Sequence, residues 1–472
     1  MSTSLEPASA VRPSAWSTVR EALRGSEQDF TQGPIGRAVV LLAIPMVLEM
    51  SLESVFAVVD VFFVSRLGAH AVTAVGLTES MLALVYALAM GLSIAVTAVV
   101  ARRWGEKDRD GAAHAAAQAL LLGIAVAIVL GVAGVILAED LLRLMGAEPE
   151  VIAVGLDYTR IMLGGEVTII LLFLLNAAFR GAGDPVIAMR VLWIANAINI
   201  VLDPLLILGI GPFPELGVTG AAVATTIGRG VGVVIAFRAL VRPGHRLTVV
   251  ARHWRLDPTV IRSVLRLART ATLQFLIGTA SWIGLVRLLA TYGSVAVAGY
   301  TIAIRLVIFG ILPSWGLSNA AATMVGQALG AKDPERANRS VWVASRYNLA
   351  FLGILGAIFV LFAPQIVSWF GNDPAVAYVA ERALRIVALG FPLYAFGMVL
   401  TQAFNGAGDT WTPTWLNLIV FWLFEIPLAW VLARTLGLGP DGAFWAITIA
   451  FSALAGASAL VWRRGRWRTM QV

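Results

Sequence analysis

Long apolar runs separated by short polar loops make up almost the whole chain. Many of these runs are about 18 residues long or longer, enough for an α-helix to cross roughly 30 Å of hydrocarbon. We therefore expect an all-α integral membrane protein. The runs predict about twelve membrane-spanning helices, near residues 35–65, 71–101, 111–138, 151–180, 186–210, 217–241, 260–292, 296–328, 337–363, 376–405, 411–436 and 441–462.

One short motif occurs twice. Residues 178–184 read Ala-Phe-Arg-Gly-Ala-Gly-Asp and residues 403–409 read Ala-Phe-Asn-Gly-Ala-Gly-Asp. The same spacing separates Gly105 from Gly330, Asp108 from Asp333 and Gly68 from Gly293. A period close to half of the chain indicates a tandem duplication. An even number of spans per half gives both halves one orientation, so we expect two six-helix lobes related by a pseudo-two-fold axis along the membrane normal.

The polar segments divide the chain into five parts. We expect a cytoplasmic N-terminal extension over 1–33, an N-lobe over 34–242, a linker over 243–258, a C-lobe over 259–463 and a cytoplasmic tail over 464–472. Residues 1–33 contain no apolar run of signal-peptide type. A short amphipathic helix at 15–23 is one interpretation, but the polar composition favours a tail without fixed structure.

Composition and charge agree with a membrane protein. Only 13% of the residues are charged, against about 25% in soluble proteins. The net charge of +7 is typical of basic cytoplasmic loops and does not require a nucleic-acid partner. Alternate loops are basic, which predicts a multi-pass protein of the inner (plasma) membrane with both termini cytoplasmic. The basic positions are Arg12, Arg20, Arg24 and Arg37; Arg102, Arg103, Lys107 and Arg109; Arg180 and Arg190; Arg242, Arg246, Arg252 and Arg255; Lys332, Arg336 and Arg339; and Arg463, Arg464, Arg466 and Arg468.

Charged residues inside spans are costly, so each is a candidate functional residue. Asp60 lies late in the first span, and Asp203 lies in the fifth, four residues after Asn199 and therefore on the same helix face. Two carboxylates and a carboxamide can share a proton or hold a Na⁺ ion through oxygen atoms. The alternative is that Asn199 and Asp203 only satisfy a helix kink at Pro204.

Three further acidic residues are secondary candidates. Glu49 and Glu53 precede Asp60 in the first span and form with it an acidic stripe that would extend a cation path. Glu425, two residues before Pro427, is the best carboxylate candidate in the second half. Each of the three can equally be a satisfied polar contact.

Several other chemistries find no support in the sequence. Cysteine is absent and the four histidines have no metal-ligand spacing. No Gly-rich nucleotide loop or hydrolase motif occurs. We therefore expect no enzyme, no cofactor and no ATP-driven pump. A lipid-linked oligosaccharide flippase and a major-facilitator transporter remain alternatives to an ion-coupled exporter.

The chain resembles the multidrug and toxic compound extrusion (MATE) family. The resemblance rests on Pro45 with Asp60-x-x-Phe-Val-x-x-Leu-Gly68, on the duplicated Phe-x-Gly-Ala-Gly-Asp turn, and on residues 214–225. The polar residues are similar to those of the DinF-like and archaeal branch. The NorM-like branch uses acidic residues in its seventh and tenth spans, where this chain has Gln274 and no acid before Glu381 near the start of the tenth.

The resemblance assigns roles to individual residues. Asp60 would couple ion movement, and Pro45 would be the point at which the first helix bends. The other positions that match the branch's ion-binding residues are Asn176, Tyr158, Asn199, Asp203 and Thr225, with Thr226 as the alternative to Thr225. The implied activity is export of cationic or amphipathic small molecules in exchange for H⁺ or Na⁺, by a monomer in the lipid bilayer.

Overall fold

The computed structural model describes residues 15–26, 28–64, 67–370 and 373–472, without the side chains of 15, 57–62 and 64. In these ranges the regular structure is helical throughout, which confirms the all-α expectation. Among the described residues, eleven helices are long and apolar enough to cross a membrane, or twelve if a bent pair forms one span. The spans follow the apolar runs of the sequence closely.

The N-lobe contains seven helices. They are α2 (Ile35–Val64), α3 (Ala69–Gly105), α4 (Arg109–Leu144), α5 (Pro149–Gly164), α6 (Glu166–Gly181), α7 (Pro185–Ile207) and α8 (Val218–Val241), and a linker with the 3₁₀ turn η2 (Ala251–Trp254) follows. α5 and α6 together make one span, interrupted at Gly165.

The C-lobe repeats this order. It contains α9 (Pro258–Ala290), α10 (Ser294–Gly330), α11 (Pro334–Val367), the bent pair α12 (Pro374–Leu389) and α13 (Phe391–Gly406), and α16 (Pro440–Arg463). The eleventh span consists of α14 (Trp411–Asn417), η3 (Leu418–Glu425), α15 (Ile426–Trp430) and η4 (Val431–Thr435), and η3 and η4 are π-helical. The 3₁₀ helix η5 (Arg466–Thr469) follows α16.

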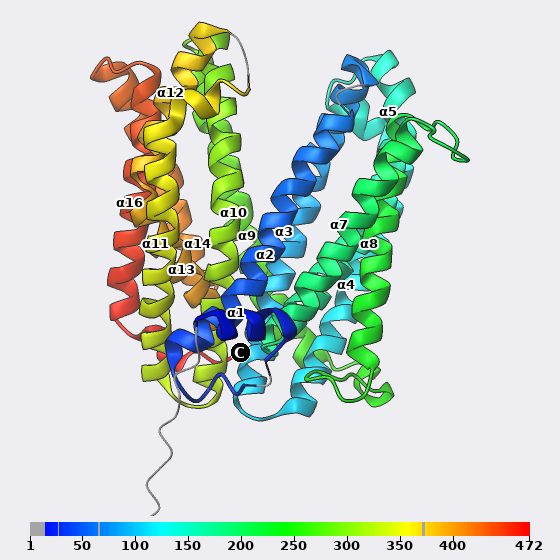
Figure 1. Cartoon of the computed structure of the whole chain (residues 1–472), viewed down its shortest axis with the longest axis vertical. Helices are drawn as coiled ribbons and strands as arrows, with labels where there is room; N and C mark the ends of the chain where they lie inside the picture. The colour runs from blue at the N-terminus through cyan, green and yellow to red at the C-terminus, as the bar shows by residue number, and fades with distance from the viewer. Residues whose placement is uncertain (1–14, 27, 65–66, 371–372) are drawn as a thin grey trace, which may run out of the picture.

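The two lobes diverge from one end of the molecule. They lie together where α1 and the C-terminus are found, and they are splayed apart where α5 and α12 lie (Figure 1). We call the end with α1 and the C-terminus the terminal face. Breaks occur at matching places in the two lobes, because Gly165 and Gly390 occupy equivalent positions of the sequence repeat and the C-lobe pair bends by 58°.

The repeated sequence motifs have the same structure in both lobes. Lys107 and Lys332 have φ angles of 65° and 58°, which is uncommon for a residue with a side chain. The next residue in each copy, Asp108 or Asp333, caps the following helix by accepting a backbone N–H at 2.8 Å. The duplication is therefore expressed at the level of turn geometry.

Glycines allow the lobes to meet at the terminal face. A Cβ on Gly105 would lie 2.0 Å from the carbonyl oxygen of Gln327, and a Cβ on Gly330 would lie 2.0 Å from that of Arg102. Each lobe also donates a hydrogen bond to the Gly-rich turn of the other: Arg102 Nη2 to Ala407 O at 3.1 Å, and Gln327 Nε2 to Gly181 O at 2.9 Å. The duplicated turn thus presents carbonyl oxygens to the opposite lobe.

We expect Gly105→Ala to open the terminal face. The added methyl group overpacks a helix contact, which typically costs about 1–3 kcal/mol and would shift the balance of conformations by roughly 5–150-fold. Because the chain has no cysteine, spin labels on Glu148→Cys and Ala375→Cys can report the distance between α5 and α12. That distance should shorten in the variant. Gly76→Ala, also on α3, is the control, since a Cβ on Gly76 meets nothing within 4 Å. Equal distance distributions in the two variants would contradict the expectation.

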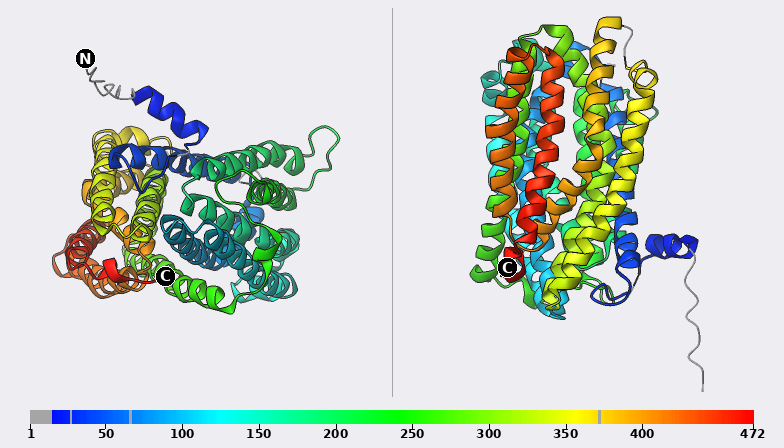
Figure 2. Two further views of the ribbon diagram at one scale, coloured as in Figure 1. Left: turned by 90° about the horizontal axis from the view of Figure 1, so that it is seen from below. Right: turned by 90° about the vertical axis from the view of Figure 1, so that its left-hand side faces the viewer.

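Residues 15–26 and 28–33, which precede the first span, have a defined structure. This corrects the expectation of a tail without fixed structure. α1 (Ala15–Arg24) runs crosswise to the long helices (Figure 2), with Ala22 only 1% exposed. Burial alone would raise the pKa of Glu21, but the hydrogen bonds from Arg37, at 2.5 Å, and Ser26 outweigh it and lower that pKa.

Two arginines of the basic loops hold the residues that follow α1. Arg336 is only 6% exposed and donates to the carbonyl oxygens of Phe30, Gln32 and Gly33 at 2.8–3.0 Å. Arg246 of the linker donates to Ser26 O and Gln28 O at 3.1 and 2.8 Å. The two arginines satisfy five backbone carbonyl oxygens in this way. They therefore stabilise the structure in addition to contributing to the basic character of the loops.

Candidate functional site

A buried polar cluster joins α7 and α8 in the N-lobe. Asn199, Asp203 and Thr225 are 2%, 0% and 6% exposed. In the amide orientation that satisfies both ends of Asn199, its Nδ2 donates to Asp203 Oδ2 at 2.9 Å, and its Oδ1 accepts from Thr225 N at 3.0 Å and Thr225 Oγ1 at 2.9 Å. The i,i+4 spacing read from the sequence therefore brings Asn199 and Asp203 into direct contact.

Close packing of α7 against α8 positions this cluster. A Cβ on Gly228 would lie 2.6 Å from Ala195 O, and one on Gly220 would lie 2.5 Å from Leu206 O. Small residues let helix backbones approach in a membrane. Thr225, on the contacting face of α8, thereby reaches Asn199, whereas Thr226 contacts the Gly165 region instead.

The other residues expected at the site occupy separate helices. Asn176 on α6 and Tyr158 on α5 are each 4% exposed. Asn176 Oδ1 is buried and has no hydrogen-bond partner within the described part of the chain. Asp60 belongs to α2, but its side chain lies outside the described residues, so its distance to Asp203 stays a prediction.

Pro45 lies inside α2, well after the helix begins at Ile35. Pro45 therefore does not mark the start of this helix. The next residue is in close contact with the C-lobe, because a Cβ on Gly316 of α10 would lie 2.4 Å from Met46 O. Pro45 leaves α2 without one internal hydrogen bond. At that same place α2 packs closely against α10 of the C-lobe.

The acidic stripe of the first span is split between two partners. Glu49 is 1% exposed and accepts from Arg180 Nη1 at 2.7 Å, and Arg180 Nη2 also donates to Ser93 Oγ at 3.3 Å. Glu53 accepts from Asn196 Nδ2 at 3.2 Å. The sequence pattern assigned Arg180 to a basic loop, but Arg180 is buried within α6. Its guanidinium there compensates the charge of Glu49.

A cationic residue in the same lobe was not predicted from the sequence. Arg229 on α8 donates to the Tyr86 hydroxyl at 2.7 Å, with its guanidinium 5.8 Å from the ring centroid. An arginine in the middle of an apolar span was the available signal. Asn196, three residues before Asn199 on α7, was overlooked in the same way.

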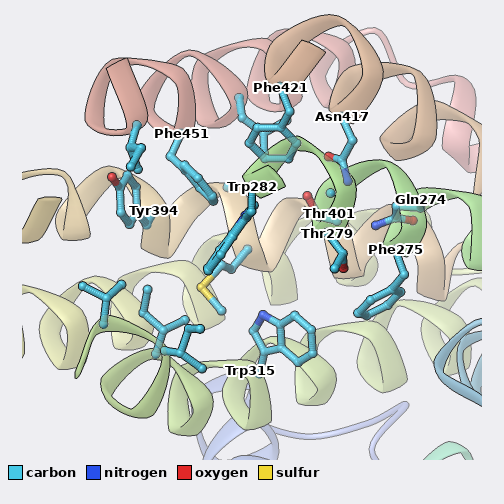
Figure 3. A pocket seen from close by; sticks show the side chains of 18 of the residues that line it. Gln274, Phe275, Thr279, Trp282, Trp315, Tyr394, Thr401, Asn417, Phe421 and Phe451 are labelled. Carbon is cyan, nitrogen blue, oxygen red and sulfur yellow. The ribbon is translucent and has the colours of Figure 1, made fainter. Parts of the chain in front are cut away.

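A second polar region lies in the C-lobe. A cavity of about 510 Å³ is lined mainly by α9, α10, α13, α16 and the eleventh span (Figure 3). Gln274 and Glu425 belong to its lining. Glu425 is 2% exposed and ends the π-helical segment η3. The sequence predicted this span correctly but not its π-helical turns, which are frequent at functional sites.

Comparison with known proteins decides the family. A model of MatE matches the chain twice, over residues 45–205 and 271–431. The chain belongs to the MatE family. The starts of the two matches are separated by almost the same spacing as the repeated motifs, in agreement with the duplication. Membership confirms the resemblance and excludes the major-facilitator alternative.

Relatives of this MatE protein cover nearly its whole length. It is 27% identical to "Probable multidrug resistance protein YoeA" of Bacillus subtilis, over 91% of this chain and 95% of the relative. It is also 27% identical to the "FAD transporter" of Shewanella oneidensis, over 84% and 88%. A solved structure called "Outward-facing conformation of a multidrug resistance MATE family transporter of the MOP superfamily" superposes with a TM-score of 0.86 at 27% identity, covering 93% of this chain and 97% of that one.

Proposed function

We propose that this MatE protein exports cationic or amphipathic small molecules across the plasma membrane in exchange for H⁺ or Na⁺. The observation that carries the proposal is the buried Asn199–Asp203–Thr225 cluster between α7 and α8. A carboxylate with no exposed surface in a membrane protein is costly and is typical of ion pathways. Relatives with multidrug resistance names support the substrate class.

In this proposal the N-lobe holds the coupling ion. Asp60 and Asp203 supply carboxylate oxygens, which suit a hard cation or a shared proton, and Asn199 positions Asp203 by donating to its Oδ2. Asn176 offers a buried oxygen that no described residue satisfies, and Tyr158 completes the set. Glu53 on α2 accepts a hydrogen bond from Asn196 on α7 and would extend the ion path toward Asp60. The assignment follows the DinF-like and archaeal pattern.

We further propose that the terminal face is cytoplasmic. Alternate basic loops, including those with Lys107 and Lys332, point to that side by the positive-inside rule. The splayed end of the lobes then opens outward (Figure 1), so the structure would be the state that releases substrate. A monomer provides both lobes and needs no second subunit.

Two other substrate classes fit the same fold. One relative is named an FAD transporter, and a flippase would carry a lipid-linked oligosaccharide. Both ligands carry phosphate groups. The described lining of the C-lobe cavity contains Glu425 and no Lys, Arg or His, so it disfavours an anion and favours a cation.

Reconstituted vesicles test the proposal. A fluorescent organic cation is added outside vesicles that carry either a pH gradient or a Na⁺ gradient, each imposed separately. Uptake against its concentration gradient with one of the two ions is expected. If neither ion gradient drives uptake of cationic, neutral or anionic dyes, the protein is not such an antiporter.

We expect Pro45→Ala to slow transport more than it weakens substrate binding. Restoring the missing N–H would stabilise a straight α2 by roughly 3 kcal/mol, the typical cost of an internal proline, and would resist a bend between conformations. Transport rate and dye affinity are measured on the same preparation. Equal transport by the variant and the parent protein at equal expression would show that α2 does not bend there.

A further inference from the structure

The C-lobe cavity contains an unpaired carboxylate. Glu425 is 2% exposed, and within the described part of the chain it has neither a hydrogen bond nor an ion pair. No basic side chain lines the cavity among the described residues. A buried carboxylate without a partner is strongly unfavourable unless a ligand or a proton compensates it.

Three amide oxygens in the described cavity wall also lack a hydrogen-bond donor. Gln274 Oε1, Asn405 Oδ1 and Asn417 Oδ1 are buried without a hydrogen-bond partner in the described ranges, and all three residues line the cavity. Buried acceptors are normally satisfied. The unmet groups are therefore acceptors that share one cavity with an anion, which calls for a ligand with N–H donors and positive charge.

The remaining wall is aromatic. Trp282, Trp315, Tyr394, Phe421 and Phe451 point into the cavity from several different elements (Figure 3). Phe421 and Phe451 pack with ring centroids 5.0 Å apart, and Tyr394 and Phe451 with centroids 4.8 Å apart. Aromatic faces attract cations and stack on planar rings.

The eleventh span presents a ladder of cavity residues. Asn417, Phe421 and Glu425 follow one another at intervals of four and are 8%, 6% and 2% exposed. They bound or belong to the π-helical segment η3. One helix therefore offers an acceptor, a ring and a carboxylate in series along the cavity wall.

We propose that this cavity binds a planar aromatic cation bearing N–H groups, with Glu425 as its counter-charge and the three amide oxygens as acceptors. The proposal rests on the proposed function, of which it names the substrate site and the substrate class. The volume of about 510 Å³ lies in the usual range for small-molecule sites, roughly 300–1,000 Å³. Substrate and coupling ion would then occupy different lobes.

Proflavine, a flat diamino-acridine cation, is the probe. Its binding to the purified protein in nanodiscs is followed by fluorescence anisotropy, with neutral acridine as the uncharged comparison. We expect Glu425→Gln to weaken proflavine binding by about tenfold or more and to leave the weak binding of acridine unchanged. Glu166→Gln is the matched control, because Glu166 is a 1% exposed carboxylate in the other lobe.

A second variant tests the cavity without touching its charge. A Cβ on Gly278 would meet nothing within 4 Å, and Gly278 lines the cavity. Gly278→Leu should therefore fill the space and reduce proflavine affinity without a backbone clash. Gly456→Leu, also without a neighbour within 4 Å but outside the cavity lining, is its control.

The outcomes separate this inference from the proposed function. Wild-type affinity for proflavine in both Glu425→Gln and Gly278→Leu overturns the C-lobe site, even if an ion gradient drives proflavine uptake. Binding that depends on Glu425 and Gly278, with no uptake under either gradient, upholds the site and overturns the antiport proposal.

Discussion

Asp203→Asn should reduce ion-driven export by about tenfold or more while the protein remains folded in the membrane. The asparagine keeps the shape of the side chain and can still hydrogen bond to Asn199, but it neither binds a proton nor carries a full charge. Asp203 is 0% exposed, so solvent cannot replace its carboxylate. Initial rates of dye uptake under each imposed gradient measure the effect.

Asp157→Asn is the control for this prediction. Asp157 lies on α5 of the same lobe, with its side chain 73% exposed. Asp60→Asn should produce the same loss as Asp203→Asn, and the double variant should be no worse than either single one, because groups that act on one ion are not additive. Normal coupled rates in Asp203→Asn would remove it from the ion site.

Glu49→Gln should destabilise the protein by about 3–5 kcal/mol, the usual effect of breaking a buried ion pair. Arg180, 8% exposed, would be left as a buried cation facing an amide. The free energy of unfolding is measured by denaturant titration in detergent, with the tryptophan signal as the readout.

The second repeat indicates how the pair can be replaced. Gln274 and Asn405 occupy the positions of the second repeat that correspond to Glu49 and Arg180, so the C-lobe has two uncharged amide side chains there. Glu49→Gln combined with Arg180→Asn copies the C-lobe. We expect it to lose much less stability than the sum of the single changes. Additive losses would show that Glu49 and Arg180 do not act as a pair.

Local patterns in the sequence predicted most of the fold. Spans follow from continuous apolar runs, and the lobes from the repeat at nearly half the chain length, because both depend on composition and spacing alone. The contact between Asn199 and Asp203 was accessible for the same reason, since four residues separate them on one helix.

Contacts between distant segments were not accessible. Glu49 and Arg180 are 131 residues apart, and Arg229 and Tyr86 are 143 apart, so only the packing of the lobes brings them together. The order of residues 15–26 and 28–33 likewise depends on arginines far along the chain, including Arg336. The π-helical turns around Glu425 arise in a stretch whose apolar pattern is that of an ordinary helix.

The exchange mechanism requires that an ion bound at the Asp203 cluster opposes substrate binding. Its most direct test is the Kd of proflavine, measured at two pH values without Na⁺ and at two Na⁺ concentrations at fixed pH. We expect one of the two ions to raise the Kd of the wild-type protein by roughly 5–150-fold, and Asp203→Asn to remove this dependence. An ion dependence in Asp203→Asn equal to that of the wild type, or a wild-type Kd that neither ion changes, would contradict it.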